Sequence, residues 1–321
     1  MNDQTNNPGP RESLPSLLII DAHAHLWLQQ SAEVDGQLIY GLGGGRAFFM
    51  GEVRQMLPPY MTRGCNTAEA LLANMDYAQV AAAVITQEYI DGSQNDYLRE
   101  VQRLYPGRFL CCALVDARRP GFAAEAEQAV GEGFRAFKLP AGRLIMSDRR
   151  VRLTSNEMMS LFATLSRNGL ILSVDLADGA GQTAEMEEVI AEYPSLKIAV
   201  GHFGMVNRPG WQEQIKLARH SNVMIESGGI TWLFHNEFYP YHGAVKAIRE
   251  AASLAGIEKL MWGSDYPRTM VAITYRMSYD FILRSDILSE DEKRLFLGAN
   301  AQAFYGFGPL PEMPYVKSML E

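Results

Sequence analysis

The chain has 321 residues, of which 47% are hydrophobic and 21% charged, and its formal net charge is −8. This length fits one large α/β domain or two ordinary ones. No basic cluster stands out, which argues against a nucleic-acid partner. Its three cysteines give no disulfide framework, which favours reduced thiols in a cytoplasmic protein.

The start of the chain, residues 1–13, is polar and rich in Asn and Pro, so we expect a flexible tail and not a signal peptide. The apolar run that follows is too short to span a bilayer, so we expect no membrane partner.

Short apolar runs alternate with helical patterns from here onward. The predicted strands are 17–26, 81–88, 109–116, 134–140, 170–177, 196–202, 223–227 and 259–265. The predicted helices are 67–79, 96–105, 122–131, 155–168, 183–193, 211–221, 241–255 and 289–304. Since each strand is too apolar to face water, the pattern predicts an α/β fold, a single-domain (β/α)8 TIM barrel over residues 14–306. A doubly wound open sheet is the rival, but it calls for a glycine-rich phosphate turn where this chain has histidines.

One connection is much longer than the others. Residues 27–66, between the first strand and the first helix, are rich in Gly, Pro and aromatic side chains and too apolar for disorder. Loops of this length are often lids, and in a barrel this one would emerge on the catalytic face, so we predict a lid-like insertion. Gly41–Gly45 lacks the lysine and hydroxyl residue of a phosphate loop and reads as a hinge or turn. At the other end, residues 307–321 are predicted to be a C-terminal extension that packs across the barrel or onto a second copy in a homodimer.

Two histidines, His23 and His25, end the first apolar run. Because successive side chains of a strand point to opposite faces, both imidazoles and Asp21 are expected on one face, with Ala22 and Ala24 on the other. Two imidazoles at the carboxyl end of a buried strand form half of a metal site. The alternative is a hydrogen-bonded core that contains histidines, which is costly because buried imidazoles need partners.

Polar side chains end the other predicted strands too, at the positions that face the active site of a barrel. These residues are Gln87, Glu88, Asp116, Lys138, Asp175, His202, Glu226 and Asp265. Burial of such groups is costly unless they pair or bind a cation. His202 lies between Gly201 and Gly204, which let the backbone approach a site closely. Asp265 shortly precedes a turn-forming proline, as in many plain loops, so the prediction that it belongs to the active site depends on the other motifs.

Basic side chains are candidates to bind an acidic substrate, since a guanidinium pairs with a carboxylate through two hydrogen bonds. The arginines considered are Arg46, Arg54, Arg63 and Arg268. Each alone is more typical of a solvated surface, and Arg268, which lies closest to Asp265 in sequence, is the leading candidate. Lys138 and Glu226 are also expected among the substrate-binding residues. The aromatic stretch 232–241 after the seventh strand is expected to pack, with a place in the pocket wall as the alternative.

Three segments together resemble the amidohydrolase superfamily, in the branch that contains aminocarboxymuconate-semialdehyde decarboxylase and resorcylate decarboxylase. They are the His-x-His segment Ile20–His25, then Val200–Gly204, and the Gly-Ser-Asp-Tyr-Pro segment Gly263–Pro267. The resemblance implies a distorted barrel, a divalent metal, and hydrolysis or nonoxidative decarboxylation. By position, it implies that His23 and His25 bind the metal and that Asp265 binds it and can take a proton from water. It implies that His202 is a general acid/base or electrophile.

One position departs from the family pattern. The fifth strand of the family usually ends in a histidine, and here it ends in Asp175. Asp175 is a metal ligand, a partner that orients an imidazole, or a sign that the metal is lost, as in some lactonases of similar sequence. A carboxylated Lys138 that bridges two metals is a further option.

The leading hypothesis is a mononuclear metal-dependent hydrolase of a small carboxylated substrate that cleaves a lactone, ester or amide. The metal, zinc with manganese as the alternative, is assigned to His23, His25, Asp175 and Asp265. Asp265 acts as general base and His202 stabilises the oxyanion or donates a proton. The first alternative is a metal-dependent decarboxylase of an aromatic or enol acid, and the second is a metal-free lactonase or an inactive barrel.

Overall fold

Eight parallel strands form the centre of the protein in the computed structural model, which describes residues 17–147, 150–310, 313 and 319. Their order in the sheet is β1-β6-β7-β8-β9-β10-β11-β12. The strands are β1 (Ile20–His25), β6 (Ala82–Thr86), β7 (Phe109–Leu114), β8 (Ala136–Leu139), β9 (Ile171–Val174), β10 (Lys197–Val200), β11 (Val223–Glu226) and β12 (Leu260–Met261). All eight coincide with predicted strands, so the predicted TIM barrel is confirmed.

Backbone hydrogen bonds between β1 and the segment after β12 close the barrel. The amide of Ala22 donates to the carbonyl of Trp262 over 2.9 Å, and the amide of His25 donates to the carbonyl of Tyr266 over 2.8 Å. We call this junction the seam. It joins the first and last strands of the chain.

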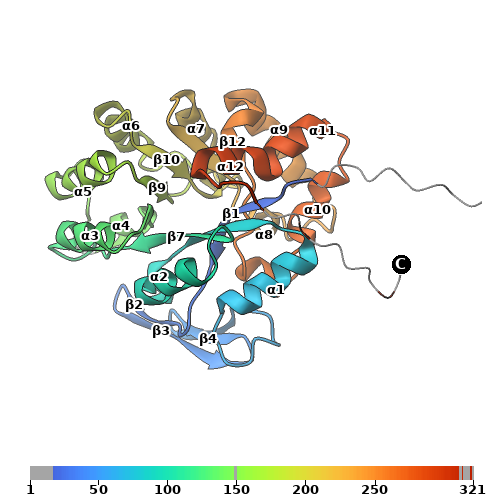
Figure 1. The fold of residues 1–321 in the computed structure, drawn as a ribbon, viewed down its shortest axis with the longest axis horizontal. Coiled ribbons are helices and arrows are strands. Elements are labelled where there is room, and N and C mark those ends of the chain that lie inside the picture. The colour runs from blue at the N-terminus through green and yellow to red at the C-terminus, as the bar shows by residue number, and fades with distance from the viewer. Residues whose placement is uncertain (1–16, 148–149, 311–312, 314–318, 320–321) are drawn as a thin grey trace, which may run out of the picture.

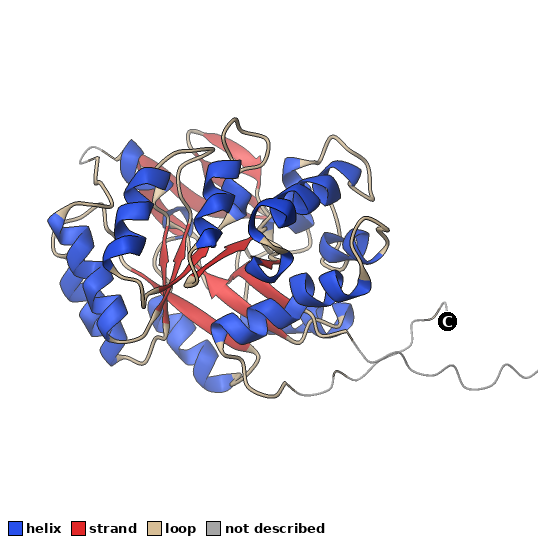
Figure 2. Ribbon diagram, turned by 90° about the horizontal axis from the view of Figure 1, so that it is seen from above, coloured by secondary structure: helices blue, strands red, loops and turns tan. Residues whose placement is uncertain are grey.

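Helices surround the strands (Figures 1 and 2). The longer ones are α1 (Ala68–Ala78), α2 (Asn95–Leu104), α3 (Phe122–Gly131), α5 (Asn156–Arg167), α6 (Thr183–Glu192) and α9 (His242–Ala255). The shorter ones are α4 (Gly142–Met146), α7 (Gln212–Lys216), α8 (Ile230–Leu233), α10 (Met277–Leu283), α11 (Glu290–Arg294) and α12 (Asn300–Tyr305). A π-helical turn, Leu295–Ala299, joins the last two, and 3-10 turns occupy Tyr89–Asp91, His202–Gly204, Leu217–Arg219, Ile257–Lys259 and Arg268–Val271.

Apolar side chains form two layers, one inside the barrel and one between strands and helices. Adjacent Cys111 and Cys112 on β7 illustrate the alternation, since Cys111 packs in the outer layer and Cys112 in the inner one. Phe304 and Tyr305 of α12 join the inner layer, and Phe307 and Leu310 pack against it. The start of the predicted C-terminal extension therefore covers part of the inner core.

The insertion after β1 is a four-stranded antiparallel sheet and not an irregular loop. It consists of β2 (Ser31–Val34), β3 (Gln37–Gly43), β4 (Arg46–Phe49) and β5 (Glu52–Gln55), paired in that order. Val34 and Ile39 anchor it in the core, whereas every residue of β5 is exposed. Gly44 and Gly45 form the turn between β3 and β4, as predicted. The lid role of residues 27–66 stays a prediction.

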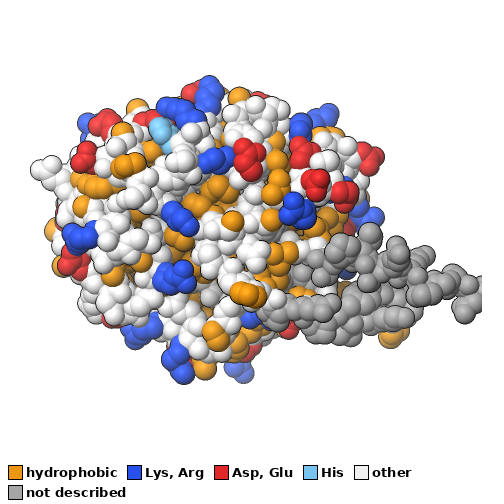
Figure 3. All heavy atoms as spheres, turned by 45° about the horizontal axis from the view of Figure 1, so that its top comes forward, with side chains coloured by type: hydrophobic (Ala, Val, Ile, Leu, Met, Phe, Trp, Pro, Cys, Tyr) orange, Lys and Arg blue, Asp and Glu red, His pale blue; other side chains and the backbone are white. Residues whose placement is uncertain are grey.

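Both ends of the chain lie largely beyond the structural description. The predicted tail, residues 1–13, and most of the extension 307–321 are outside the described residues. Within the part that is described, no helix has the length and apolarity needed to cross a bilayer. Basic side chains are spread between acidic and apolar ones on the face shown in Figure 3, with no basic cluster on it.

Candidate active site

A cavity of about 570 Å³ lies at the carboxyl ends of the strands. Its polar lining includes Glu88, His25, Asp175, His202, Asp265 and Arg268. This volume lies in the range of small-molecule sites. The barrel therefore brings together the strand-end side chains that the sequence singled out.

Three donor atoms meet at the floor of the cavity. The Nε2 atoms of His23 and His25 are 3.1 Å apart, and Asp265 Oδ1 lies 2.9 Å from His25 Nε2 and 3.9 Å from His23 Nε2. Their side chains are at most 5% exposed. Burial, together with the nearby Arg268 charge, holds the pKa of His25 well below its usual value. Burial opposes ionisation of Asp265, but bonding to His25 and the charge of Arg268 hold the pKa of its carboxyl well below the usual range.

A β-bulge in β1 aims these histidines. The register against β6 shifts between Asp21 and Ala24, so that Ala22 packs in the inner layer and Ala24 in the outer layer. The prediction that the two alanines share a face is wrong, because it assumed strict alternation along the strand. The imidazoles of His23 and His25 still meet, with ring centroids 4.9 Å apart.

Glu226, at the end of β11, orients His23. Its Oε1 lies 2.7 Å from His23 Nδ1, and its Oε2 accepts a hydrogen bond from the amide of Gly228 over 2.5 Å. A carboxylate accepts a hydrogen bond from a protonated Nδ1, so Nε2 is the nitrogen left with a free lone pair. Glu226 is 1% exposed and does not line the cavity, so it lies beneath His23.

His202 lies between two acceptors. Its Nδ1 donates to the carbonyl of Gly228 over 2.7 Å, and its Nε2 is 3.5 Å from Asp175 Oδ2. Burial disfavours the charged imidazole, but the Asp175 carboxylate outweighs burial and raises the pKa of His202 to about 10. This environment favours the protonated form of His202, and Nε2 is the nitrogen that faces Asp175.

Asp175 is also paired with Lys138. The Lys138 Nζ lies 2.6 Å from Asp175 Oδ1, a close ion pair without hydrogen-bond geometry. Burial disfavours both charges, yet each partner favours the other: Asp175 raises the pKa of Lys138, and Lys138 lowers the pKa of Asp175. Lys138 is 1% exposed and does not line the cavity.

A model of the amidohydrolase family matches residues 20–307 of this chain. The chain belongs to the amidohydrolase family. This confirms the resemblance that its three motifs carry. No curated protein sequence matches this amidohydrolase.

Solved structures similar to this amidohydrolase share its fold at low sequence identity. A probable 2-pyrone-4,6-dicarboxylic acid hydrolase from Acinetobacter baumannii, with citric acid bound, has a TM-score of 0.66 and 18% identity, over 90% of this chain and 99% of that one. An amidohydrolase from Burkholderia multivorans with bound zinc has a TM-score of 0.64 and 17% identity, over 91% of this chain and 100% of that one. A 5-carboxyvanillate decarboxylase from Sphingomonas paucimobilis has a TM-score of 0.60 and 16% identity, over 91% of this chain and 100% of that one.

The floor of the site in this amidohydrolase has the donor chemistry of a metal centre. Tetrahedral zinc with bonds of about 2.0–2.1 Å separates its ligand atoms by about 3.4 Å. The separations among His23, His25 and Asp265, 2.9 to 3.9 Å, bracket that value. The His23–Glu226 contact is the carboxylate–histidine arrangement that supports metal ligands. These three residues can therefore hold a divalent ion.

Asp175, which was also assigned to the metal, belongs to a second group of donors. It converges with His23 and His202, while His23, His25 and Asp265 form the first group. Its Lys138 and His202 contacts fit a residue that orients an imidazole.

Arg268 reaches the site but is already held by acidic groups. Its guanidinium is 2.5 Å from Asp91 Oδ2 and 3.7 Å from Asp265 Oδ1, and it lies over the ring of Trp27. The other arginines proposed as substrate-binding do not line the cavity. Arg46, Arg54 and Arg63 are exposed on the insertion, where Arg54 pairs with Glu52.

Asp21 has a structural role at the seam. It accepts hydrogen bonds from the amides of His23 (3.0 Å) and Ser264 (2.8 Å) and from the hydroxyl of Tyr275 (2.8 Å). Burial raises the pKa of its carboxyl to about 6, against the effect of these bonds. Burial and the nearby Asp175 charge likewise raise the pKa of Glu88 to about 8.

Sequence reasoning missed two contacts in the cavity. Trp232, for which packing was preferred over a place in the pocket wall, donates from Nε1 to Asp265 Oδ2 over 2.9 Å. Arg143 lines the cavity from α4, a helix that was not predicted. The position of Trp232 soon after β11 is a signal that could have found it, since such segments form the mouth of a barrel.

Proposed function

We propose that this protein is a mononuclear metal-dependent hydrolase that opens a lactone or cleaves an ester or amide in a small carboxylated substrate. The observation that carries the proposal is the convergence of His23, His25 and Asp265 at 2.9 to 3.9 Å beside a cavity. The ion we assign to them is zinc. When bound, such an ion polarises a carbonyl group and lowers the pKa of water toward about 7.

The protein's own side chains perform the remaining steps. Asp265 is ionised and takes the proton of the attacking water, while Trp232 holds its second oxygen in place. His202, charged at neutral pH, stabilises the developing oxyanion and then protonates the leaving oxygen or nitrogen from Nε2. Asp175 favours the charged form of His202, and the Lys138 ammonium keeps Asp175 ionised.

The relatives guide the choice of substrates. A 2-pyrone dicarboxylic acid is a cyclic ester with two carboxylates, and a structural neighbour is a probable hydrolase of it. Another neighbour is a decarboxylase of a carboxylated aromatic acid. Decarboxylation would use the same site, with His202 as the proton donor to carbon.

The test compares the wild type with His23→Ala and with a control, His220→Ala. The control removes a half-buried histidine that pairs with Glu187 and does not line the cavity. We expect one zinc per chain by elemental analysis in the wild type and in His220→Ala. In His23→Ala, we expect the zinc content to be at least tenfold lower. Activity is measured on carboxylated lactones and esters, with carbon dioxide release from aromatic acids as the competing readout.

Equal zinc content and equal activity in the wild type and His23→Ala would contradict the proposal. Carbon dioxide release without ring opening would replace hydrolysis with decarboxylation. Lactone hydrolysis by a zinc-free wild type would support the metal-free alternative.

A further inference from the structure

One cation in the cavity, Arg143, has no acidic partner among the residues that the structure describes. Arg143 lies on α4, which directly follows β8, and its half-buried side chain lines the same cavity as His202 and Asp265. Among the described residues, no ion pair or hydrogen bond engages its guanidinium. A guanidinium offers five donors in a rigid fork, so an unpaired one inside a cavity is suited to an anion.

The other charged groups around the cavity are already matched. Asp175 faces Lys138, and Asp265 faces His25 and Arg268. Asp178, also in the lining, pairs with Arg208 over 3.2 Å. Arg268 is itself bound to Asp91, and Glu88 lies within the field of Lys138 and Arg268. The positive charge of Arg143 is therefore left for a ligand.

The surroundings of Arg143 are apolar. Pro140, Ile145, Met146, Leu176 and Met205 line the cavity with it. Leu176 is buried, whereas Ile145 and Met146 are exposed. These apolar side chains offer no acceptor that would compete for the guanidinium. They also suit the carbon skeleton of a small molecule better than a second anionic group. One fork in an otherwise apolar wall matches the two oxygens of a single carboxylate.

We propose that Arg143 binds a carboxylate of the substrate, with the carbon skeleton against the apolar wall and the reacting group at His25, His202 and Asp265. This inference rests on the proposed function, since it names the substrate class of the same site. It replaces Arg268 as the carboxylate-binding residue. Arg268 instead positions Asp265, because its guanidinium already lies between Asp91 and Asp265.

The experiment measures binding by calorimetry with two non-reacting probes that differ in one group, 3-carbamoylbenzoate and isophthalamide. The first has one carboxylate, and the second has a neutral amide in its place. We expect the wild type, as purified, to bind 3-carbamoylbenzoate at least tenfold more tightly. We expect Arg143→Ala to remove that preference, and Arg143→Lys, which keeps the charge but not the fork, to retain part of it.

Arg54→Ala is the matched control, because it removes an exposed arginine that does not line the cavity. It should keep the wild-type preference. A wild type that binds both probes equally or neither of them, or an Arg143→Ala protein that keeps the preference, would overturn the inference. Arg143→Lys keeps the inference testable if the alanine variant does not fold. Lysine cannot form two parallel hydrogen bonds to a carboxylate, so a lysine variant with the full wild-type preference would refute the bidentate contact.

Zinc content separates this inference from the proposed function. A zinc-free wild type whose preference for 3-carbamoylbenzoate is lost in Arg143→Ala would contradict the metal and support the carboxylate contact. A zinc-containing wild type that binds both probes equally would support the metal and contradict the carboxylate contact.

Discussion

At the scale of single residues, the site depends on neighbours that fix where each proton lies. Glu226 holds a proton on His23 Nδ1, and the Gly228 carbonyl holds one on His202 Nδ1. His202 and Asp265 also have left-handed backbones, with φ of 59° and 57°. Non-glycine residues rarely adopt this conformation, and it is concentrated at functional sites. Both the protonation and the direction of these side chains are thus set before a ligand arrives.

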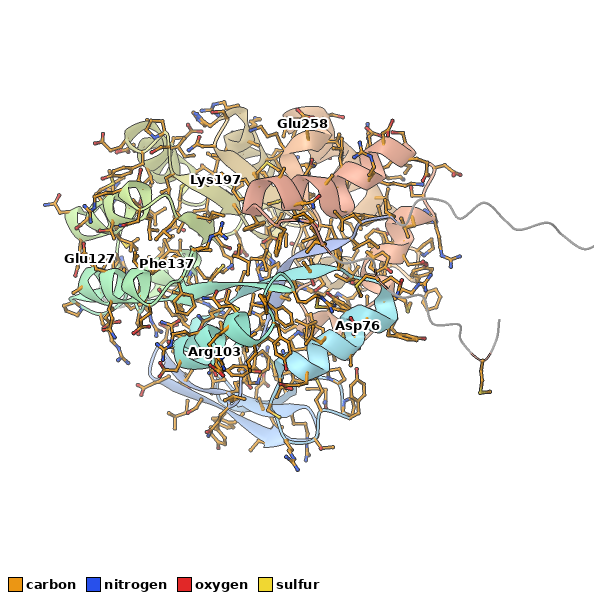
Figure 4. The ribbon with its side chains drawn as sticks, in the orientation of Figure 1. Asp76, Arg103, Glu127, Phe137, Lys197 and Glu258 are labelled. Carbon is orange, nitrogen blue, oxygen red and sulfur yellow. The ribbon has the colours of Figure 1, made fainter. Side chains whose placement is uncertain are left out.

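Glu226→Gln tests the orientation of His23. The amide keeps the shape of the side chain but loses the charge that favours Nδ1–H, so we expect zinc affinity to fall by about 10- to 100-fold. Competition with a chelator measures that affinity. Glu258→Gln, at the outer edge of the molecule (Figure 4), is the control and should match the wild type. Unchanged affinity in Glu226→Gln would mean that His23 needs no carboxylate partner.

Lys138→Met tests the buried ion pair. The change leaves the Asp175 carboxylate without its cation, which costs about 3–5 kcal/mol of unfolding free energy in buried pairs. Urea denaturation measures this cost, and we expect the Lys138→Met/Asp175→Leu double variant to recover most of it. Lys216→Met, in an exposed pair with Glu213, should cost less than about 1 kcal/mol. A double variant no better than the single one would refute the pairing.

The sequence alone predicted which residues gather at the carboxyl ends of the strands, but not which of them face the cavity. Strand ends placed His202 and Asp265 correctly, because parallel strands of a barrel present one end to one face. The same rule could not separate Glu226 and Lys138, which lie beneath the floor, from residues that line it. That distinction depends on side-chain packing between strands far apart in the sequence.

At the scale of elements, glycines after the strands make room for the carboxylates. A Cβ on Gly201 would lie 2.7 Å from Glu226 Oε1 and would overlap Asp175 Oδ1. A Cβ on Gly228 would lie 2.9 Å from His23 Nδ1, and one on Gly263 would lie 2.7 Å from His23 Cβ. The ends of three strands therefore approach one another more closely than any other residue permits.

Gly201→Ala tests this close approach without backbone strain, because Gly201 has φ of −83°. The new methyl group must displace Asp175 or Glu226, so we expect activity or zinc affinity to fall at least tenfold. Gly131→Ala is the control, since nothing lies within 4 Å of its added Cβ. It should leave both quantities unchanged. If Gly201→Ala kept the zinc affinity and activity of the wild type, Asp175 and Glu226 would be able to move aside without loss of function.

The long elements of the fold were predictable, and the short ones were not. Eight strands and the helices that cover them follow from apolar periodicity. The sheet β2–β5 was read as a lid-like loop, because its strands are short, glycine-rich and mostly exposed. The helices α4, α8 and α10 were missed for a related reason, since four to seven residues give too little periodicity.

At the scale of the whole molecule, the barrel itself was predictable because each strand is buried on both faces. A doubly wound sheet would present the same apolar runs, and the His-x-His motif in place of a phosphate turn decided between them. The closure of the barrel was not predictable in detail. It depends on the hydrogen bonds from Ala22 and His25 to the segment after β12, which no local pattern reveals.

Metal removal is the prediction that belongs to this scale. His23 and His25 lie on one side of the seam and Asp265 on the other, so a bound ion links the two edges of the barrel. An ion that binds only the folded state stabilises it by about 2.7 kcal/mol at 100 times its dissociation constant. We expect a chelator to lower the melting temperature and added zinc to restore it. In His23→Ala, both treatments should have no effect; an equal response there would place the stabilising ion elsewhere.

The seam also sets the moment at which the site comes into existence. His25 and Asp265 are 240 residues apart in sequence, yet their side chains are in contact. A nascent chain that ends before β12 carries His23 and His25, two of the three donors, but lacks Asp265. The proposed zinc site is complete only after the last strand has docked against the first, so we expect metal uptake by a nascent chain to report completion of the entire barrel.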